Sequence, residues 1–314
     1  MPPLPRPERP AGIMHGDFPD YNSGPALRAY LEKRGLGIRK YWGQHFLINP
    51  SARRAVAEAL EMEKAGSVWE IGSGMGCMTK ELLQAGGRVT AFEVDPGFCA
   101  ILEGLFASFS GFTLVKGDVL KTWKSCGGGS PYLLGNLPYT VAAALLGDLI
   151  EGGRFFTRMS VTVQKEVARR MTALPGSADY SSLSVLCASA YTVRIVMTLK
   201  GASFYPPPRV ESAVVCFERR EDFPAPAPLF FPLVRALFAS RRKTIVNNLE
   251  HFLGCSCIMD GVPRTAVPEA AAAALEQSGV RGGERAEKLP PEAFAALTAA
   301  LTPFVKEKKS DEHG

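Results

Sequence analysis

Short apolar runs alternate with amphipathic stretches through the middle of this chain. The runs that predict strands span residues 67–72, 88–95, 112–118, 131–137, 160–164, 192–200 and 212–220. Segments with helical spacing lie between them, including SLSVLCASAY before the sixth run. Apolar strands that alternate with helices are typical of a parallel sheet covered on both faces. The pattern therefore predicts a doubly wound, mostly parallel α/β domain over residues 26–220.

The two ends of the chain have different patterns. Residues 1–25 are rich in Pro and Gly and lack apolar periodicity, which predicts a mobile N-terminal extension, whereas residues 26–34 have helical spacing. The proline-rich EDFPAPAPL at 221–229 predicts a linker, and three helical stretches follow it. We therefore expect residues 221–314 to form a small, all-α C-terminal domain.

Composition sets limits on the function. The chain has 314 residues, of which 46% are hydrophobic, and a formal net charge of +5. This allows a full core and is compatible with a polyanionic partner, without proving one. There is neither the apolar segment of a signal peptide nor a run long enough to span a membrane, so a cytoplasmic protein is expected. The seven cysteines have no paired C-x-x-C spacing, and the lone C-x-C at Cys255 and Cys257 lacks further ligands, so no metal site is predicted.

A glycine-rich turn follows the first predicted strand. The segment EIGSGMGC at 70–77 places Gly72 and Gly74 where the chain must turn sharply and let a ligand approach the backbone. Its G-x-G-x-G spacing departs from the dinucleotide fingerprint G-x-G-x-x-G. Alone, the turn leaves open a dinucleotide, a nucleoside cofactor or a structural turn.

Two carboxylates sharpen that prediction. Glu93 ends the second strand about 20 residues after the turn, where it can accept hydrogen bonds from ribose hydroxyls. Asp118 ends the third strand and can accept from an adenine amino group. Since the chain has no lysine-bearing phosphate loop, an adenosine cofactor without phosphates fits best.

The segment Asn136-Leu137-Pro138-Tyr139 follows the fourth strand and is the strongest chemical signal. An exocyclic adenine amine is a poor nucleophile because its lone pair is delocalised into the ring. An amide oxygen and a backbone carbonyl can accept both amine hydrogens, proline can stiffen the loop, and tyrosine can stack on an extruded base. The alternative is an ordinary turn built from Asn and Pro. The segment at 136–139 follows the glycine turn and the two acids, and this order favours a catalytic role. Catalysis would then consist of aligning an amine with a donor methyl, and would need neither a metal nor a covalent nucleophile.

These ordered motifs resemble the ribosomal RNA small-subunit adenine dimethyltransferase family of the KsgA type. The resemblance runs from about Tyr41 to Phe294. It is carried by QHFL at 44–47, EIGSGMGCMT, FEVD, KGDVL, GNLPY, VQKEVARRM, SLSV, FYPPPRVESAV at 204–214, ASRRKTIVNNL and ERAEKLPPEAF. It implies a Rossmann-like class I methyltransferase that uses S-adenosylmethionine (SAM). Such an enzyme dimethylates two adjacent adenosines in a hairpin near the 3′ end of the small-subunit RNA.

The resemblance also implies residue roles. The cofactor contacts would be His45, Leu47, Gly72, Gly74, Glu93, Asp118 and Asn136. Tyr139 and Phe204 would sandwich the target adenine, although Phe204 by itself would be interpreted as a core residue. The chain departs from the usual family pattern at His45, where bacterial members have Asn, at Ser73, and at Thr140-Val141-Ala142.

Basic residues cluster in two places. Arg241, Arg242 and Lys243 form a compact run that we expect on a long helix, and Arg169 and Arg170 lie on another. Such clusters can neutralise RNA phosphates or form a solvated helix face, and the family resemblance favours RNA binding. The expected partner is small-subunit ribosomal RNA or a precursor subunit, bound by a monomer.

Three other hypotheses remain at this point. A large-subunit rRNA adenine methyltransferase of the antibiotic-resistance type would use the same chemistry. A ribosome-assembly factor would bind and proofread precursor subunits, with catalysis secondary. An NAD-type oxidoreductase is disfavoured by the glycine spacing.

Overall fold

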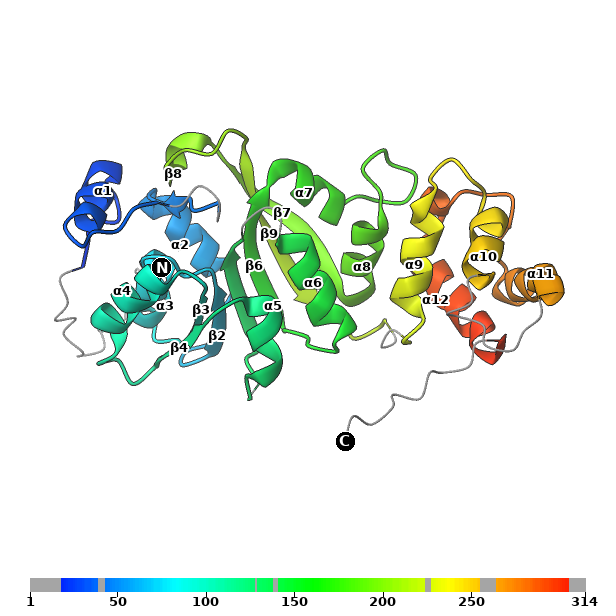
Figure 1. Ribbon diagram of the computed structural model, residues 1–314, viewed down its shortest axis with the longest axis horizontal. Helices are drawn as coiled ribbons and strands as arrows, with labels where there is room; N and C mark the ends of the chain where they lie inside the picture. Colours follow the sequence, from blue (N-terminus) through cyan, green and yellow to red (C-terminus); the bar gives the residue numbers. More distant parts are fainter. Residues whose placement is uncertain are drawn as a thin grey trace, which may run out of the picture. The chain divides into compact units, whose positions relative to one another are not determined.

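The computed structural model describes residues 18–38, 43–127, 129–137, 141–223, 227–254 and 264–304 (Figure 1). The chain folds into two compact units. The α/β unit comprises residues 1–148, 155–168 and 193–219, and the helical unit comprises residues 149–154, 169–192 and 220–314. The expected domain boundary at residue 220 thus coincides with the point where the chain passes from the α/β unit to the helical unit for the last time. Two earlier segments also belong to the helical unit, which the linear pattern did not indicate.

A seven-stranded sheet forms the centre of the fold, in the order β4-β3-β2-β5-β6-β9-β7. Its strands are β2 (Ser67–Ile71), β3 (Arg88–Glu93), β4 (Phe112–Lys116), β5 (Tyr132–Asn136), β6 (Arg158–Gln164), β7 (Tyr191–Leu199) and β9 (Ser212–Arg219). The first five pair in parallel, and β9 is antiparallel to β6. All seven predicted strands are therefore confirmed, together with the mostly parallel α/β fold.

The central strands are buried on both faces. On β2, Val68 packs in one hydrophobic cluster, and its neighbour Trp69 points to the opposite face, as alternation along a strand requires. There Trp69 contacts Phe92 and Phe156, with ring centroids 5.0 and 5.5 Å apart. Such double burial explains why these strands are continuous apolar runs in the sequence.

Helices flank the sheet (Figure 1). Those that begin in the α/β unit are α1 (Gly24–Glu32), α2 (Pro50–Glu58), α3 (Cys77–Gln84), α4 (Pro96–Phe106), α5 (Val119–Thr122), α6 (Ala142–Glu151) and α7 (Lys165–Met171). Local sequence sets their starts: Asn49 caps α2 by accepting from the Ala52 amide at 2.9 Å, and Asp95 caps α4. Two short strands that the pattern did not predict, β1 (Phe46–Leu47) and β8 (Phe204–Tyr205), pair antiparallel.

The expected N-terminal extension does not reach residue 25. Residues 18–25 pack against the fold: the Tyr21 side chain is 6% exposed, and α1 already begins at Gly24. The sequence pattern missed this because buried Tyr21 lies between Pro and polar residues rather than in a periodic run.

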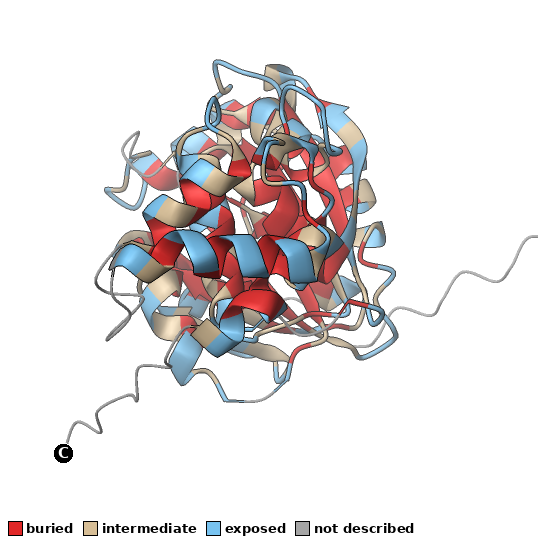
Figure 2. Cartoon of the chain, turned by 90° about the vertical axis from the view of Figure 1, so that its right-hand side faces the viewer, coloured by how far each residue is buried: buried red, intermediate tan, exposed pale blue. Residues whose placement is uncertain are grey.

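The helical unit contains α8 (Ser182–Ala190), α9 (Phe230–Ala239), α10 (Ile245–Leu253), α11 (Val267–Ser278) and α12 (Pro291–Leu301). Its core includes the stacked rings of Phe238 and Phe294, and the buried Tyr180 hydroxyl donates to the Leu289 carbonyl at 2.8 Å. Buried and exposed positions alternate along the helices nearest the viewer in Figure 2, as amphipathic helices require. The expected all-α character of the C-terminal segment is therefore found in its described residues.

Candidate functional site

The strand order reverses between β2 and β5, which creates the crevice in which doubly wound folds bind ligands. Ile71 at the end of β2 is paired with Gly135, so the glycine turn and Asn136 leave the sheet side by side. In the turn, Gly72, Gly74 and Gly76 have φ values of +74°, +56° and +83°. A Cβ on Gly74 would lie 2.9 Å from the Phe46 ring. Glycine is therefore needed at Gly74 for both its backbone angle and its close approach.

A cavity of about 690 Å³ opens at this edge of the sheet, within the size range of small-molecule sites. Six of the seven residues predicted to bind the cofactor line it: His45, Gly72, Gly74, Glu93, Asp118 and Asn136. Leu47, the seventh, is 2% exposed and belongs to the hydrophobic core. The structure thus brings together side chains that are up to 91 residues apart in the sequence.

Glu93 is held at the end of β3 by backbone amides. Its carboxylate accepts hydrogen bonds from the amides of Gly74 at 2.7 Å, Val94 at 2.9 Å and Asp95 at 2.8 Å. Burial raises the pKa of Glu93, and these three hydrogen bonds oppose the rise. Asp118 lies at the start of α5, where Oδ1 accepts from the Leu120 amide at 3.0 Å. The carboxylates are fixed acceptors beside the ends of two neighbouring strands, β3 and β4, as hydroxyl and amino donors of an adenosine would require.

Glu70 is a cavity residue that we did not select from the sequence. It is 2% exposed and accepts a hydrogen bond from Thr79 Oγ1 at 2.6 Å. Burial raises the pKa of Glu70 from 4.5 to about 7. The sequence did contain a signal for this residue: an acid within an otherwise apolar strand, two positions before Gly72.

The orientation of the Asn136 amide is set by a backbone carbonyl. Its Nδ2 donates to the His45 carbonyl oxygen at 2.7 Å, and because that oxygen only accepts, Oδ1 must be the other end of the amide. The His45 ring is anchored in turn: Nδ1 lies 2.7 Å from the Pro206 carbonyl oxygen and must donate to it. His45 therefore connects the predicted catalytic segment to the FYPPP segment.

The other predicted catalytic residues are placed differently. Leu137 is 2% exposed and its amide donates to the Thr162 carbonyl at 3.1 Å, so it anchors the end of β5. Phe204 is 3% exposed and packs in the core opposite Leu47, and it does not line the cavity. Pro138 and Tyr139 lie outside the described residues. The predicted stacking of the target adenine between Tyr139 and Phe204 is therefore not visible in the described residues.

The basic run of the helical unit is not on a helix. α9 ends at Ala239 and α10 begins at Ile245, so Arg241, Arg242 and Lys243 form the turn between them. The Lys243 amide donates to the Ser240 carbonyl at 2.9 Å, which closes this turn. Asn248 stabilises it by donating to the carbonyls of Leu237 and Ser240. The prediction of a single long helix was therefore wrong, because continuous helical spacing does not reveal a tight turn.

The five predicted RNA-binding residues differ in their surroundings. Arg241 donates to the carbonyls of Ala178 and Tyr180 and forms an ion pair with Glu287 at 3.3 Å, so it has a structural role. Arg242 and Lys243 are exposed, as is Arg169 at the end of α7, whereas Arg170 is half-buried.

The part of the chain that the structure describes contains neither a membrane-spanning helix nor a cluster of metal ligands. Within it, no helix is long and apolar enough to cross a bilayer. Nor do three or more His, Cys, Asp or Glu side chains gather there in an arrangement able to hold a metal ion. Cys255 and Cys257 lie outside the described residues.

The sheet order and the glycine turn beside Asn136 define a Rossmann-like class I methyltransferase. The chain belongs to the ribosomal RNA adenine dimethylase family, whose model matches residues 35–259. A relative from Treponema denticola, named "Ribosomal RNA small subunit methyltransferase A", is 39% identical over 293 residues, which cover 89% of this chain and 95% of the relative. The family and enzyme class expected from the sequence, an rRNA adenine dimethyltransferase, are thereby confirmed.

Two solved structures share the fold. A dimethyladenosine transferase from Plasmodium falciparum has a TM-score of 0.67 and 24% identity, over 81% of this chain and 96% of that chain. The 23S rRNA methyltransferase ErmE has a TM-score of 0.56 and also 24% identity, over 82% of this chain and 99% of that one. These similarities support the class I methyltransferase fold.

Proposed function

We propose that this enzyme uses SAM to dimethylate the N6 atoms of two adjacent adenosines in a hairpin near the 3′ end of small-subunit ribosomal RNA. The single observation that supports the chemistry best is the Asn136 amide, held by the His45 carbonyl at the rim of a cavity lined by Glu93 and Asp118. The small-subunit substrate follows the printed name of the T. denticola relative, which this chain matches over nearly its whole length.

The cavity has the chemistry that SAM requires. Glu93 would hold the ribose hydroxyls, Asp118 the adenine amino group, and the backbone at Gly72 and Gly74 the remainder of the molecule. The volume of about 690 Å³ and a lining that combines apolar side chains with fixed carboxylates fit a nucleoside with an amino-acid tail. When bound, SAM supplies a methyl group activated by a positively charged sulfonium.

Asn136 would act on the substrate amine. Its Oδ1 would accept a hydrogen bond from the exocyclic amine of an extruded adenine and hold that nitrogen toward the cavity. A neighbouring backbone carbonyl would accept the second amine hydrogen. The fixed amide spends no free energy on reorganisation when the nitrogen develops positive charge. No side chain of the site needs to form a covalent intermediate.

The helical unit would bind the RNA through its exposed basic side chains. Arg169, Arg242 and Lys243 can each neutralise a phosphate, and structured RNA is recognised mainly by shape and backbone. Arg170, half-buried, and Arg241, engaged in its own unit, would contribute less directly. We place the enzyme in the cytoplasm as a monomer, where precursor small subunits would be its partners.

The function is tested by mapping modified nucleosides. Precursor small and large ribosomal subunits that lack these methyl groups are incubated with the protein and SAM, and the RNA is digested and analysed by mass spectrometry. We expect two adjacent N6,N6-dimethyladenosines near the 3′ end of the small-subunit RNA. Modification of the large-subunit RNA alone would overturn the proposal and favour an activity like the one that the name of ErmE describes. Tight binding without methylation would favour an assembly factor instead.

A further inference from the structure

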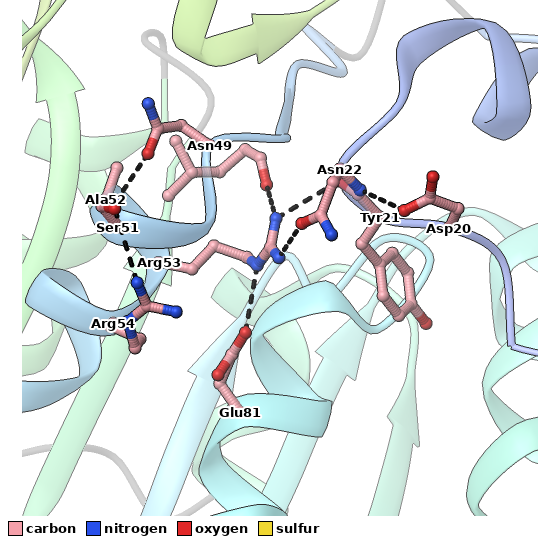
Figure 3. Close-up of polar contacts among 10 residues, drawn as sticks. Asp20, Tyr21, Asn22, Asn49, Ser51, Ala52, Arg53, Arg54 and Glu81 are labelled. Atoms are coloured by element: carbon pink, nitrogen blue, oxygen red, sulfur yellow. Dashed lines mark hydrogen bonds and ion pairs between the residues drawn. The ribbon is translucent and has the colours of Figure 1, made fainter.

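A buried guanidinium outside the cavity lining belongs to none of the predicted motifs. Arg53 on α2 is 4% exposed. Its Nη1 donates to the carbonyls of Tyr21 at 3.2 Å and Leu47 at 3.0 Å. Its Nη2 donates to Asn22 Oδ1 at 2.6 Å, and Nε donates to Glu81 Oε1 at 3.2 Å (Figure 3).

A charge that is so well buried is tolerated only when its donors are satisfied, because desolvation costs several kcal/mol. Arg53 meets that requirement by joining three segments that are distant in the sequence. These are residues 21–22, strand β1 and helix α3 (Figure 3). Its contacts thus fix the N-terminal segment to the main body of the α/β unit.

A second contact joins the same N-terminal segment to the glycine turn. The buried Tyr21 hydroxyl donates to the Met75 carbonyl oxygen at 2.7 Å. Met75 lies between Gly74 and Gly76, both of which have positive φ. Peptide groups next to such glycines reorient easily, so a hydrogen bond to this carbonyl restricts the turn.

Both contacts end on residues that directly follow the cavity lining in the sequence. Leu47 directly follows His45 and Phe46, which line it, and Met75 follows Gly74, which also lines it. Helix α1 adds a third contact, since Gly24 packs so closely on the Tyr205 ring that a Cβ would clash with it, and Tyr205 is paired with Phe46. Residues 18–32 contribute no side chain to the cavity lining, yet they support the glycine turn and β1 from outside.

We propose that residues 18–32 form a positioning segment for cofactor binding: Tyr21 of this segment and Arg53 of α2, which binds the segment, hold the glycine turn and strand β1 in their binding conformations. This inference rests on the proposed function, in which the cavity holds SAM. Because linkage is reciprocal, SAM binding must then also stabilise the packing of residues 18–32.

The sharpest test is Tyr21→Phe, which removes one hydroxyl and keeps the ring. We expect the Kd for SAM, measured by isothermal titration calorimetry, to rise about fivefold to tenfold, as loss of one buried hydrogen bond predicts. The KM for SAM should rise in parallel, while kcat at saturating SAM should stay within about twofold of wild type because no reacting group is altered. Arg53→Lys keeps the charge but not the fork of donors, and should raise the Kd further.

Tyr180→Phe is the matched control. It removes a hydroxyl that donates to the Leu289 carbonyl at 2.8 Å in the core of the helical unit. It should lower the Tm about as much as Tyr21→Phe does, since each variant loses one buried hydrogen bond, and it should leave the Kd for SAM unchanged. If Tyr21→Phe and Tyr180→Phe gave the same Kd for SAM, or if Tyr21→Phe lowered kcat instead, the positioning role would be wrong.

Hydrogen exchange tests the reciprocal effect. In wild type and in Tyr180→Phe, saturating SAM should slow amide exchange in residues 18–32, and in Tyr21→Phe the slowing should be smaller. Equal exchange in wild type with and without SAM would overturn the linkage. Failure of wild type to bind SAM at all would show instead that the proposed function is wrong, and the wild-type titration reports that outcome separately.

Discussion

The Asn136 amide is held in place at its nitrogen end, while its oxygen end stays available as an acceptor. Its Nδ2 is held by the His45 carbonyl, and this contact leaves the amide oxygen as the end that can accept from a substrate amine. This hydrogen bond fixes the amide, so its dipole would not need to reorient during the proposed reaction. Preorganised polar groups of this kind supply much of the rate enhancement in enzymes.

Replacement of Asn136 by Ala should therefore remove catalysis and keep binding. We expect kcat for methyl transfer to fall roughly a hundredfold to a thousandfold, the range seen when one preorganised group is removed. RNA affinity in a filter-binding assay should stay within about twofold, because RNA backbone contacts are expected in the helical unit. Normal methyl transfer by Asn136→Ala would show that the segment at 136–139 is not the catalytic one.

Glu70 predicts a measurable dependence of stability on pH. Its carboxyl has a pKa of about 7 in the folded protein and 4.5 ordinarily, so the folded state binds the proton more tightly. The stability contributed by this group is therefore present at low pH and is lost as pH rises from about 4.5 through about 7. The full loss amounts to roughly 3 kcal/mol.

Glu70→Gln should remove this loss. The Tm of the variant should be close to that of wild type at pH 5 and should exceed it by a growing margin up to pH 8, as measured by calorimetry. Glu103→Gln is the control, because Glu103 is half exposed in an ion pair with Lys116 and its replacement removes a charge that is not buried. A constant difference in Tm between wild type and Glu70→Gln across this range would contradict the assignment.

At the scale of elements, the glycine turn and β1 depend on each other. Gly74 is in the left-handed region, and a Cβ there would clash with the Phe46 ring, so the turn and β1 can approach this closely only because residue 74 has no side chain. The Gly74 amide also donates to Glu93. One residue thus connects the turn, β1 and the end of β3.

Gly74→Ala tests that connection. The left-handed backbone should cost about 1 kcal/mol, and the new Cβ would also press on the Phe46 ring. We expect both a lower Tm and a Kd for SAM that is at least about tenfold higher. Gly86 also has a positive φ, +85°, but a Cβ there would meet open space. Gly86→Ala should lower the Tm alone, and an equal effect of both variants on SAM binding would refute the role of this contact.

The elements also show how far the sequence could be interpreted. Strands β2, β3, β5 and β6 were predictable because burial on both faces makes them largely apolar. The edge strand β4 is less buried, and its apolar residues Phe112, Leu114 and Val115 made it recognisable. The acids Glu93 and Asp118 were predictable because strand ends in this fold converge at one edge. Strands β1 and β8 were missed because two-residue strands carry no periodicity, and their pairing joins segments about 160 residues apart.

The turn at Arg241–Lys243 was missed for a related reason. Helical spacing continues on both sides of it, and no Gly or Pro marks the break. The roles of Arg53 and Tyr21 could not be predicted either, because both depend on backbone carbonyls, which every residue has. Side chains that recognise a backbone group leave no partner motif in the sequence.

For the whole molecule, binding of cofactor and binding of RNA should be separable. The cavity lies in the α/β unit, whereas the exposed Arg242 and Lys243 lie in the helical unit. Phosphate contacts release counterions, so affinity for RNA should depend steeply on salt. Binding of SAM, in a cavity where fixed carboxylates act as acceptors, should not share that dependence.

The double replacement of Arg242 and Lys243 by Ala tests this separation. The slope of log K for RNA against log salt should become shallower by roughly two units, one for each lost phosphate contact, and the Kd for SAM should stay at its wild-type value. Arg241→Ala is the informative contrast, because its guanidinium donates to the carbonyls of Ala178 and Tyr180. It should lower the Tm of the protein and change the salt slope less than the double replacement does. If Arg242 and Lys243 could be removed without any change in slope, the RNA would have to bind elsewhere, and the helical unit would need another explanation for its exposed basic turn.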